Sequence, residues 1–120
     1  MQRLLIGKRI AKAVDTDEVG PLPPIQAPEY LLRIMNVKAP PGWRSPEHSH
    51  PGSESFYVLK GRLGHKSQHG AHFADAETVM NSHGADMPMQ VFTASETDVE
   101  LFALFVVDAT RPFSSPAKLD

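Results

Sequence analysis

The sequence contains no cysteine, and this absence narrows the chemistry that is open to the chain. Without a thiol the protein forms no disulfide bond, offers no thiolate to a metal ion and has no cysteine nucleophile. An excess of positive charge is also missing, because 12 Lys and Arg residues stand against 14 Asp and Glu residues. The resulting formal net charge of −2 disfavours nucleic acid as a partner.

Long hydrophobic runs are absent as well. The apolar run Leu4–Ile6 is flanked by charged residues and is too short for the core of a signal peptide. No later segment approaches the length of a membrane span. We therefore expect a cytoplasmic protein with no membrane partner. The sequence also has no glycine-rich phosphate loop, no nucleophile elbow and no zinc-finger spacing.

What the chain does have is the composition of one globular domain rich in turns. Its 120 residues are 41% apolar and 22% charged, and they include 11 prolines and 8 glycines. Short segments rich in β-branched and aromatic residues, separated by Pro and Gly, are typical of strands. We expect strands at 30–38, 55–59, 63–68, 78–80, 87–93 and 98–107, and no helix.

The flanking segments and the faces of the strands carry further expectations. Residues 1–14 predict a short strand or an extended arm, the proline-rich stretch 15–28 predicts a loop, and the tail from Asp108 predicts an irregular arm. The strands at 30–38 and 98–107 have apolar residues on both faces. Because such strands need cover on their outer side, we expect a homodimer.

The histidines are unevenly placed, since all six lie between His48 and His83. His48 and His50 are two residues apart, so on a strand both imidazoles point to the same face. Pro51-Gly52 then favours a turn, and Glu54 begins the next strand. Two imidazoles and one carboxylate are the donor set of an open divalent-metal site. A hydrogen-bonded polar cluster is the alternative interpretation.

The segment around these residues has a longer spacing pattern. Gly42, His48, His50, Glu54 and Gly61 are separated by five, one, three and six residues. This arrangement resembles the first motif of the cupin superfamily, in which Gly, His, His, Glu and Gly follow one another at these distances.

The second cupin motif is matched only in outline. Gly84 is retained, but Ala76 stands in place of the first glycine and Ser82 in place of the proline. Met87 takes the position of the metal-binding histidine, and Val91 that of the asparagine. The resemblance is therefore specific in the first motif and weak in the second.

The resemblance implies a small antiparallel double-stranded β-helix, or jelly-roll barrel, as the single domain of an all-β protein. The barrel is expected over 30–107, with an N-terminal arm and Pro-rich loop over 1–29 and a C-terminal arm over 108–120. In the family, the first-motif ligands and the second-motif histidine bind Fe, Mn, Ni, Zn or Cu. The resemblance implies one such divalent ion on His48, His50 and Glu54.

The missing fourth ligand leaves four outcomes open. The site is completed by water, another histidine (His65 or His83) replaces the lost ligand, Met87 itself binds and favours copper, or no metal is bound. His65 lies two residues after the apolar Leu63 in the same predicted strand, so both side chains point to the same face and we expect His65 to point inward. His65 is the candidate catalytic residue for proton transfer. The alternative interpretation is that it has only a structural role, as a buried histidine hydrogen-bonded to a neighbour.

Other side chains of the middle third have less specific predictions. His69 and His72 are expected on the surface of a hairpin tip, and Arg44 and Glu47 in a solvated loop before His48. A set of large apolar side chains is expected either to line a pocket or to form plain core: Trp43, Phe56, Met80, Met89 and Phe92.

Two classes of function follow from the resemblance, with a small organic molecule as ligand or substrate in both. One is a metal-dependent enzyme with oxygenase, isomerase or decarboxylase chemistry. The other is a non-catalytic binding module, with or without metal. A third reading is a metal-free sugar isomerase or epimerase that uses His/Tyr acid–base chemistry.

Overall fold

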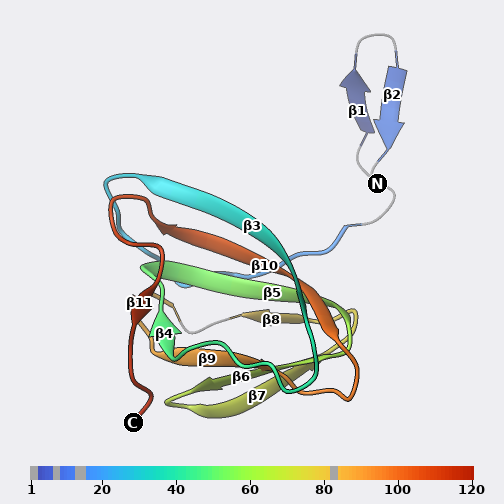
Figure 1. Cartoon of the computed structure of the whole chain (residues 1–120). Helices are drawn as coiled ribbons and strands as arrows, with labels where there is room; N and C mark the ends of the chain where they lie inside the picture. The colour runs from blue at the N-terminus through green and yellow to red at the C-terminus, as the bar shows by residue number, and fades with distance from the viewer. Residues whose placement is uncertain (1–2, 7–8, 13–15, 82–83) are drawn as a thin grey trace.

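The computed structural model describes residues 3–6, 9–12, 16–81 and 84–120, and this part of the chain is built from strands and turns without a helix (Figure 1). No helix in these segments is therefore long and apolar enough to cross a membrane. The strands are β1 (Arg3–Ile6), β2 (Arg9–Lys12), β3 (Tyr30–Ala39), β4 (His48–Ser49), β5 (Gly52–Lys60), β6 (Arg62–Ser67), β7 (Gly70–Asp75), β8 (Val79–Asn81), β9 (Met89–Thr93), β10 (Val99–Asp108) and β11 (Ser115–Pro116).

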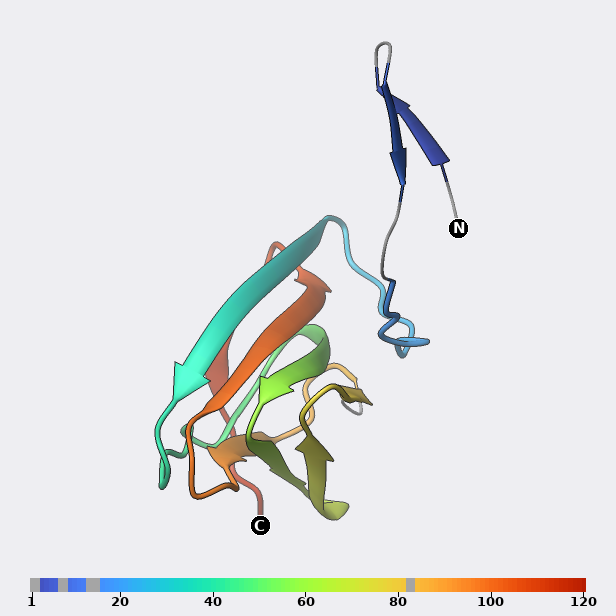
Figure 2. The same ribbon diagram turned by 90° about the vertical axis from the view of Figure 1, so that its right-hand side faces the viewer.

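Two antiparallel sheets form the body of the molecule. The first has the strand order β3-β10-β5-β8, and the second has the order β11-β4-β9-β6-β7. The sheets lie face to face and enclose the interior between them (Figure 2). The predicted all-β, jelly-roll class is confirmed. The β1–β2 hairpin forms a small sheet of its own, where the sequence predicted a single strand or an arm.

Strand β10 organises the first sheet because it pairs along its length with both β3 and β5. Its burial alternates, since Val99, Leu101, Ala103, Phe105 and Val107 are all buried. Residues that face each other across a ladder share one face of the sheet. The register therefore divides the inner face of the first sheet into levels, each made of the residues of β3, β10 and β5 that face one another.

The core fills the space between the two inner faces. Its hydrophobic part follows from the alternating pattern of the strands, and buried polar residues, among them His50, Glu54 and His65, lie beside it. Its buried members are Ala39, Phe56, Val58, Leu63, Ala74, Met89, Val91, Val99, Leu101, Ala103, Phe105 and Val107.

Two glycines of the first sheet stand where no side chain fits. Gly61 links β5 directly to β6 with φ of 76°, and a Cβ atom there would lie 2.4 Å from the Asp98 carbonyl oxygen. A Cβ atom on Gly52 would lie 2.2 Å from the Val106 carbonyl oxygen, so this glycine allows β5 to approach β10. Gly52 thereby holds the start of β5, two residues before Glu54.

Strand β7 is absent from the sequence prediction, which placed residues around Gly70 at a hairpin tip. The structure extends the pairing through β7, and His72 lies opposite His65 in the ladder. The segment has little local signal, because within β7 only Ala74 is buried. Pairing with the amphipathic strand β6 therefore determines this strand more than its own sequence does.

The tail beyond Asp108 also differs from the expectation of an irregular arm. Ser115 and Pro116 pair with Ser49 and His48, so the tail adds an edge strand, β11, to the second sheet. The Arg111 guanidinium holds the Asp86 carboxylate at 2.6 Å, and the Ala117 amide donates to the Glu47 carbonyl. A proline-containing edge strand of two residues leaves no periodic pattern in a sequence.

Candidate functional site

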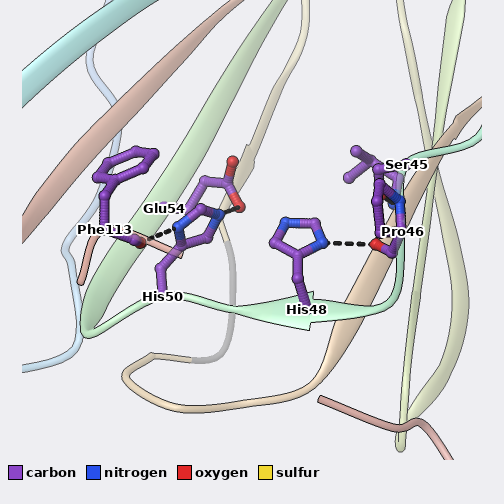
Figure 3. A network of polar contacts seen from close by, with 7 residues as sticks. Ser45, Pro46, His48, His50, Glu54 and Phe113 are labelled. Atoms are coloured by element: carbon purple, nitrogen blue, oxygen red, sulfur yellow. Dashed lines mark hydrogen bonds and ion pairs between the residues drawn. The ribbon is translucent and has the colours of Figure 1, made fainter. Parts of the chain in front are cut away.

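The first-motif histidines lie in and just after β4, the strand next to the edge of the second sheet, and Glu54 lies on β5 of the first (Figure 3). His48 belongs to β4, and His50 follows it immediately before the turn at Pro51. The two rings meet edge to face with their centroids 4.8 Å apart. The His50 Nε2 atom lies 3.8 Å from Glu54 Oε1. The three side chains predicted from the motif thus lie in one neighbourhood.

Each histidine is oriented by a backbone carbonyl. The Nδ1 atom of His48 is 2.6 Å from the Pro46 oxygen, and the Nδ1 atom of His50 is 2.6 Å from the Phe113 oxygen. A carbonyl oxygen only accepts hydrogen bonds, so both Nδ1 atoms carry the proton and donate. In the neutral rings the lone pair is consequently on Nε2, the atom that in His50 lies near Glu54.

Burial determines the protonation states of Glu54 and His50. Glu54 is 5% exposed, and loss of hydration raises the pKa of its carboxyl to about 8. Burial is also the main cause that lowers the pKa of His50, and the nearby His48 and Arg33 lower it further, against the Phe113 hydrogen bond, which raises it. Without a cation the two groups are therefore neutral partners near pH 7. A cation between them would favour the ionised carboxylate.

The wall beside His50 and Glu54 brings in the second-motif segment. Gly84, Met87 and Met89 line a small cavity together with His50, Glu54 and His65. Its volume of about 10 Å³ is close to the minimum that admits one water molecule.

The histidine and methionine predicted near this cavity occupy its wall. His65 is 3% exposed, in agreement with its predicted inward orientation. Met87 takes a place on the wall beside His50 and Glu54. His83, the other candidate for a replacement ligand, lies outside the described residues.

A larger cavity of about 220 Å³ is also lined by His50 and Glu54. Of the predicted pocket residues, Trp43 and Phe56 line this cavity and Met89 lines the smaller one. Phe92 instead packs against Phe73 on the outside of β6 and β9, with ring centroids 6.0 Å apart. The full lining is Met35, Val37, Trp43, Ser45, His48, His50, Glu54, Phe56, Leu63, Val91, Leu101, Ala103, Phe105 and Phe113.

Phe113 is the functional residue that the sequence reasoning missed. Its ring lies 4.8 Å from the rings of both His50 and Phe105, and its carbonyl oxygen orients His50. The available signal was a large aromatic residue in an otherwise polar and proline-containing tail. Such a residue usually needs a partner in the core.

The donor chemistry of the site fits a divalent transition-metal ion, because two imidazoles and a carboxyl group border one cavity. Across residues 3–6, 9–12, 16–81 and 84–120, however, no three His, Asp or Glu side chains are gathered closely enough to form a ready metal cluster. His48, His50 and Glu54 are thus chemically suitable donors that are not gathered as a metal site.

The sequence matches no family model and no curated protein, whereas solved structures resemble the fold. A cupin-like protein from Thermotoga maritima aligns with a TM-score of 0.61 and 16% identity over 73% of this chain. The DMSP lyase DddQ from Ruegeria pomeroyi aligns with a TM-score of 0.61 and 18% identity over 74% of this chain. A Cupin 2 conserved barrel domain protein from Salinispora arenicola aligns with a TM-score of 0.56 and 22% identity over 91% of this chain.

The aligned part spans different shares of these proteins. It covers 65% of the Thermotoga protein, 44% of the lyase and 75% of the Salinispora protein. At these identities the likeness establishes the fold alone. The chain has a cupin-type barrel, in agreement with the resemblance of its first motif.

Proposed function

We propose that this cupin-type barrel binds one divalent transition-metal ion through His48, His50 and Glu54, and that it acts as an enzyme on a small organic molecule in the adjoining cavity. The observation that carries the proposal is the pair of carbonyl hydrogen bonds from Nδ1 of His48 and His50. Metal-ligating histidines characteristically donate their second ring nitrogen in this way, which fixes the tautomer and the orientation of the ring.

Glu54 supports the same proposal through its burial. A carboxylate enclosed among apolar groups is costly unless it is paired with a cation. Its Oε1 atom lies 3.8 Å from the Nε2 atom of His50. A metal ion shared by these two groups would compensate the charge of the ionised carboxylate, and His48 would provide the second imidazole.

The chain's own residues have distinct roles in this proposal. A bound divalent ion would polarise a carbonyl or carboxylate oxygen of the substrate. Trp43 and Phe56 exclude water from the cavity that holds the substrate. We assign proton transfer to His65, which does not line the substrate cavity but is buried beside Glu54 in the wall of the small one. Met87 forms part of that wall, and its thioether suits a copper ion better than a harder one.

Metal content measured by plasma mass spectrometry on tag-free protein tests the site. We expect close to one ion per chain after reconstitution with Fe, Mn, Ni, Zn or Cu, and loss of that ion in His48→Ala and Glu54→Gln. His69→Ala changes an exposed turn histidine and serves as the matched control. Equal and negligible metal in the native protein and in His48→Ala, after reconstitution, would overturn the proposal.

Turnover separates the proposed enzyme from a binding module. The metal-loaded protein is offered a panel of catechols, thiols, keto acids and sugars, and substrate loss is followed by mass spectrometry. Activity that disappears on chelation and returns with the ion supports the proposal. Binding without turnover would identify a binding module, and activity that survives exhaustive chelation would identify a metal-free isomerase or epimerase.

We also propose that a second copy of the chain covers β3. This ten-residue strand is the edge of the first sheet, and its outward residues Tyr30, Leu32 and Ile34 are 59%, 65% and 60% exposed. A long apolar edge strand invites pairing, and a two-fold axis joins two such edges. Sedimentation should show a dimer for the native chain and a monomer for Ile34→Lys, whereas a native monomer would contradict this. A cytoplasmic location stays a prediction.

A further inference from the structure

The chemical character of the large cavity changes along the strands of the first sheet. Phe105 of β10 lies between Arg33 of β3 and Glu54 of β5 in the ladder, so these three residues form one level of the inner face. The next level consists of Met35, Ala103 and Phe56. All the charge on these two levels lies at the first, which is also where His50 packs on Phe105.

The cavity is small, and most of its lining is apolar. Besides Phe56, uncharged side chains such as Trp43, Leu63 and Val91 form its walls. A cavity of about 150 Å³ lined by aliphatic and aromatic groups is large enough for benzene. The volume of about 220 Å³ therefore matches a molecule with one six-membered ring and a short substituent.

The polar end of the cavity carries a cation at its border. The Arg33 guanidinium lies 3.9 Å above the ring of Phe113, a residue of the cavity lining. Met35, one level further along β3, is 40% exposed, so the cavity reaches the surface on the β3 side.

The balance of charge at this end favours an anion. With a divalent ion on His48, His50 and Glu54, the ion contributes two positive charges, Glu54 one negative charge and Arg33 one positive charge. Arg33 is exposed at the border of the cavity, and its charge together with that of the ion would favour a negatively charged ligand group. A neutral ligand of the same shape leaves that charge uncompensated.

We propose that the cavity binds a small organic acid, with an apolar body about the size of one ring at the Phe56 level and a carboxylate at the Arg33 level. Arg33 is then a recognition residue for the carboxylate. This inference rests on the proposed metal site and deepens it by naming the ligand class.

Binding of three probe molecules to the full chain tests the ligand class. Benzoate has the proposed shape and charge, benzamide is its neutral counterpart, and 2-naphthoate carries a second ring. Affinities are measured by titration calorimetry with Zn²⁺-loaded and with metal-free protein. Quenching of Trp43, the only tryptophan of the chain and part of the cavity wall, reports binding inside the barrel. Metal content is determined on the same samples.

We expect benzoate to bind the Zn²⁺-loaded protein about tenfold more tightly than benzamide, and 2-naphthoate to be excluded. Arg33→Gln should weaken benzoate binding about five- to tenfold, in the presence or absence of metal, and leave benzamide unchanged. Arg62→Gln is the matched control, because the Arg62 guanidinium stacks on Phe73 at 4.4 Å and neither residue lines the large cavity.

The possible failures are distinguishable. Protein that binds Zn²⁺ but holds benzamide as tightly as benzoate, or is insensitive to Arg33→Gln, overturns the ligand class and leaves the metal site standing. Protein that binds no metal overturns the proposed function. In that case the metal-free titrations still decide the ligand class, because loss of the benzoate preference in Arg33→Gln supports it and an unchanged or absent preference refutes it.

Discussion

The two sides of the candidate site are built in different ways. One side, His48 to Glu54, comes from seven consecutive residues, and it supplies the polar donor atoms. The other side is assembled from Met87, Met89 and Phe113, which lie far along the chain and contribute thioethers, a ring and a carbonyl oxygen. The side from His48 to Glu54, the near side, contains the residues that the motif identifies. The other side, the far side, determines how those residues are oriented.

This contrast shows that a short motif does not by itself complete a site. The His50 ring keeps its orientation through the Phe113 carbonyl, 63 residues further along the chain. That carbonyl is in place because β11 pairs with β4 and because Arg111 holds Asp86. The donor set is local, whereas its preorganisation is long-range.

Removal of the C-terminal tail has the largest expected effect on the site. A chain ending at Thr110 loses the Phe113 carbonyl while it keeps His48, His50 and Glu54. Because loss of such a supporting hydrogen bond typically costs 10- to 100-fold in metal affinity, we expect a decrease of about that size. Competition titration with a chromogenic chelator measures it.

The control for the truncation is Phe113→Ala, which removes the ring and retains the backbone carbonyl. We expect its metal affinity to stay within about threefold of the native value, since the hydrogen bond to His50 Nδ1 is preserved. Circular dichroism verifies that both variants keep their sheets. A truncated chain that is folded and binds metal with native affinity would show that the tail has no part in the site.

Met87→His tests the far side of the site by adding a nitrogen donor atom to it. Met87 is on the wall beside His50 and Glu54, at the position where the second cupin motif has histidine. A third imidazole suits Zn²⁺, Ni²⁺ and Fe²⁺ better than a thioether does, so we expect about tenfold tighter Zn²⁺ binding. The same chelator titration measures the change.

Met89→His is the companion variant for this test. Met89 lines the same small cavity, but it is buried in β9 and belongs to the hydrophobic core. A histidine there should destabilise the core without improving metal affinity. Equal gains in both variants, or no gain in Met87→His, would contradict the idea that residue 87 faces the metal position.

Much of the fold could be predicted from the sequence because its strands carry a strong local pattern. The central strands β5, β6, β9 and β10 lie within about three residues of their expected limits. Their alternating or continuous apolar residues are bounded by Pro and Gly, which is the pattern that burial of one or both faces imposes. For the same reason the inward direction of Phe56 and Val58 was predictable.

The rest depended on contacts that local pattern does not record. Strand β7 and the edge strand β11 form because a partner strand offers free hydrogen-bonding groups, and neither has an amphipathic period. The outward face of β3 was expected to be covered, and in a single chain it is exposed. Similarly, Phe92 has the apolar character of a pocket residue, yet its neighbour across the ladder is Gly64, whose missing side chain leaves room for the ring on the outside.

The smallest expected effect is the pH dependence of the free energy of unfolding that Glu54 causes. It involves the near side of the site alone. In the metal-free protein, burial raises the pKa of Glu54 to about 8 from an ordinary value of 4.5. Between these values the folded state binds a proton that the unfolded state has released, so rising pH favours unfolding. His50 is half protonated in the unfolded state at pH 6.5, its ordinary pKa, but this contribution is present in Glu54→Gln as well and cancels in the comparison.

We therefore expect the free energy of unfolding of the metal-free native chain to fall by about 1.2 kcal/mol between pH 6.5 and 7.5, relative to Glu54→Gln. Urea unfolding of both proteins at several pH values in that interval measures the difference. The glutamine variant has nearly the same shape and no titrating group, so it removes the pH dependence of all other residues from the comparison. Parallel curves for the two proteins would mean that Glu54 is already ionised in the folded state, and that its charge is compensated by the chain without a metal ion.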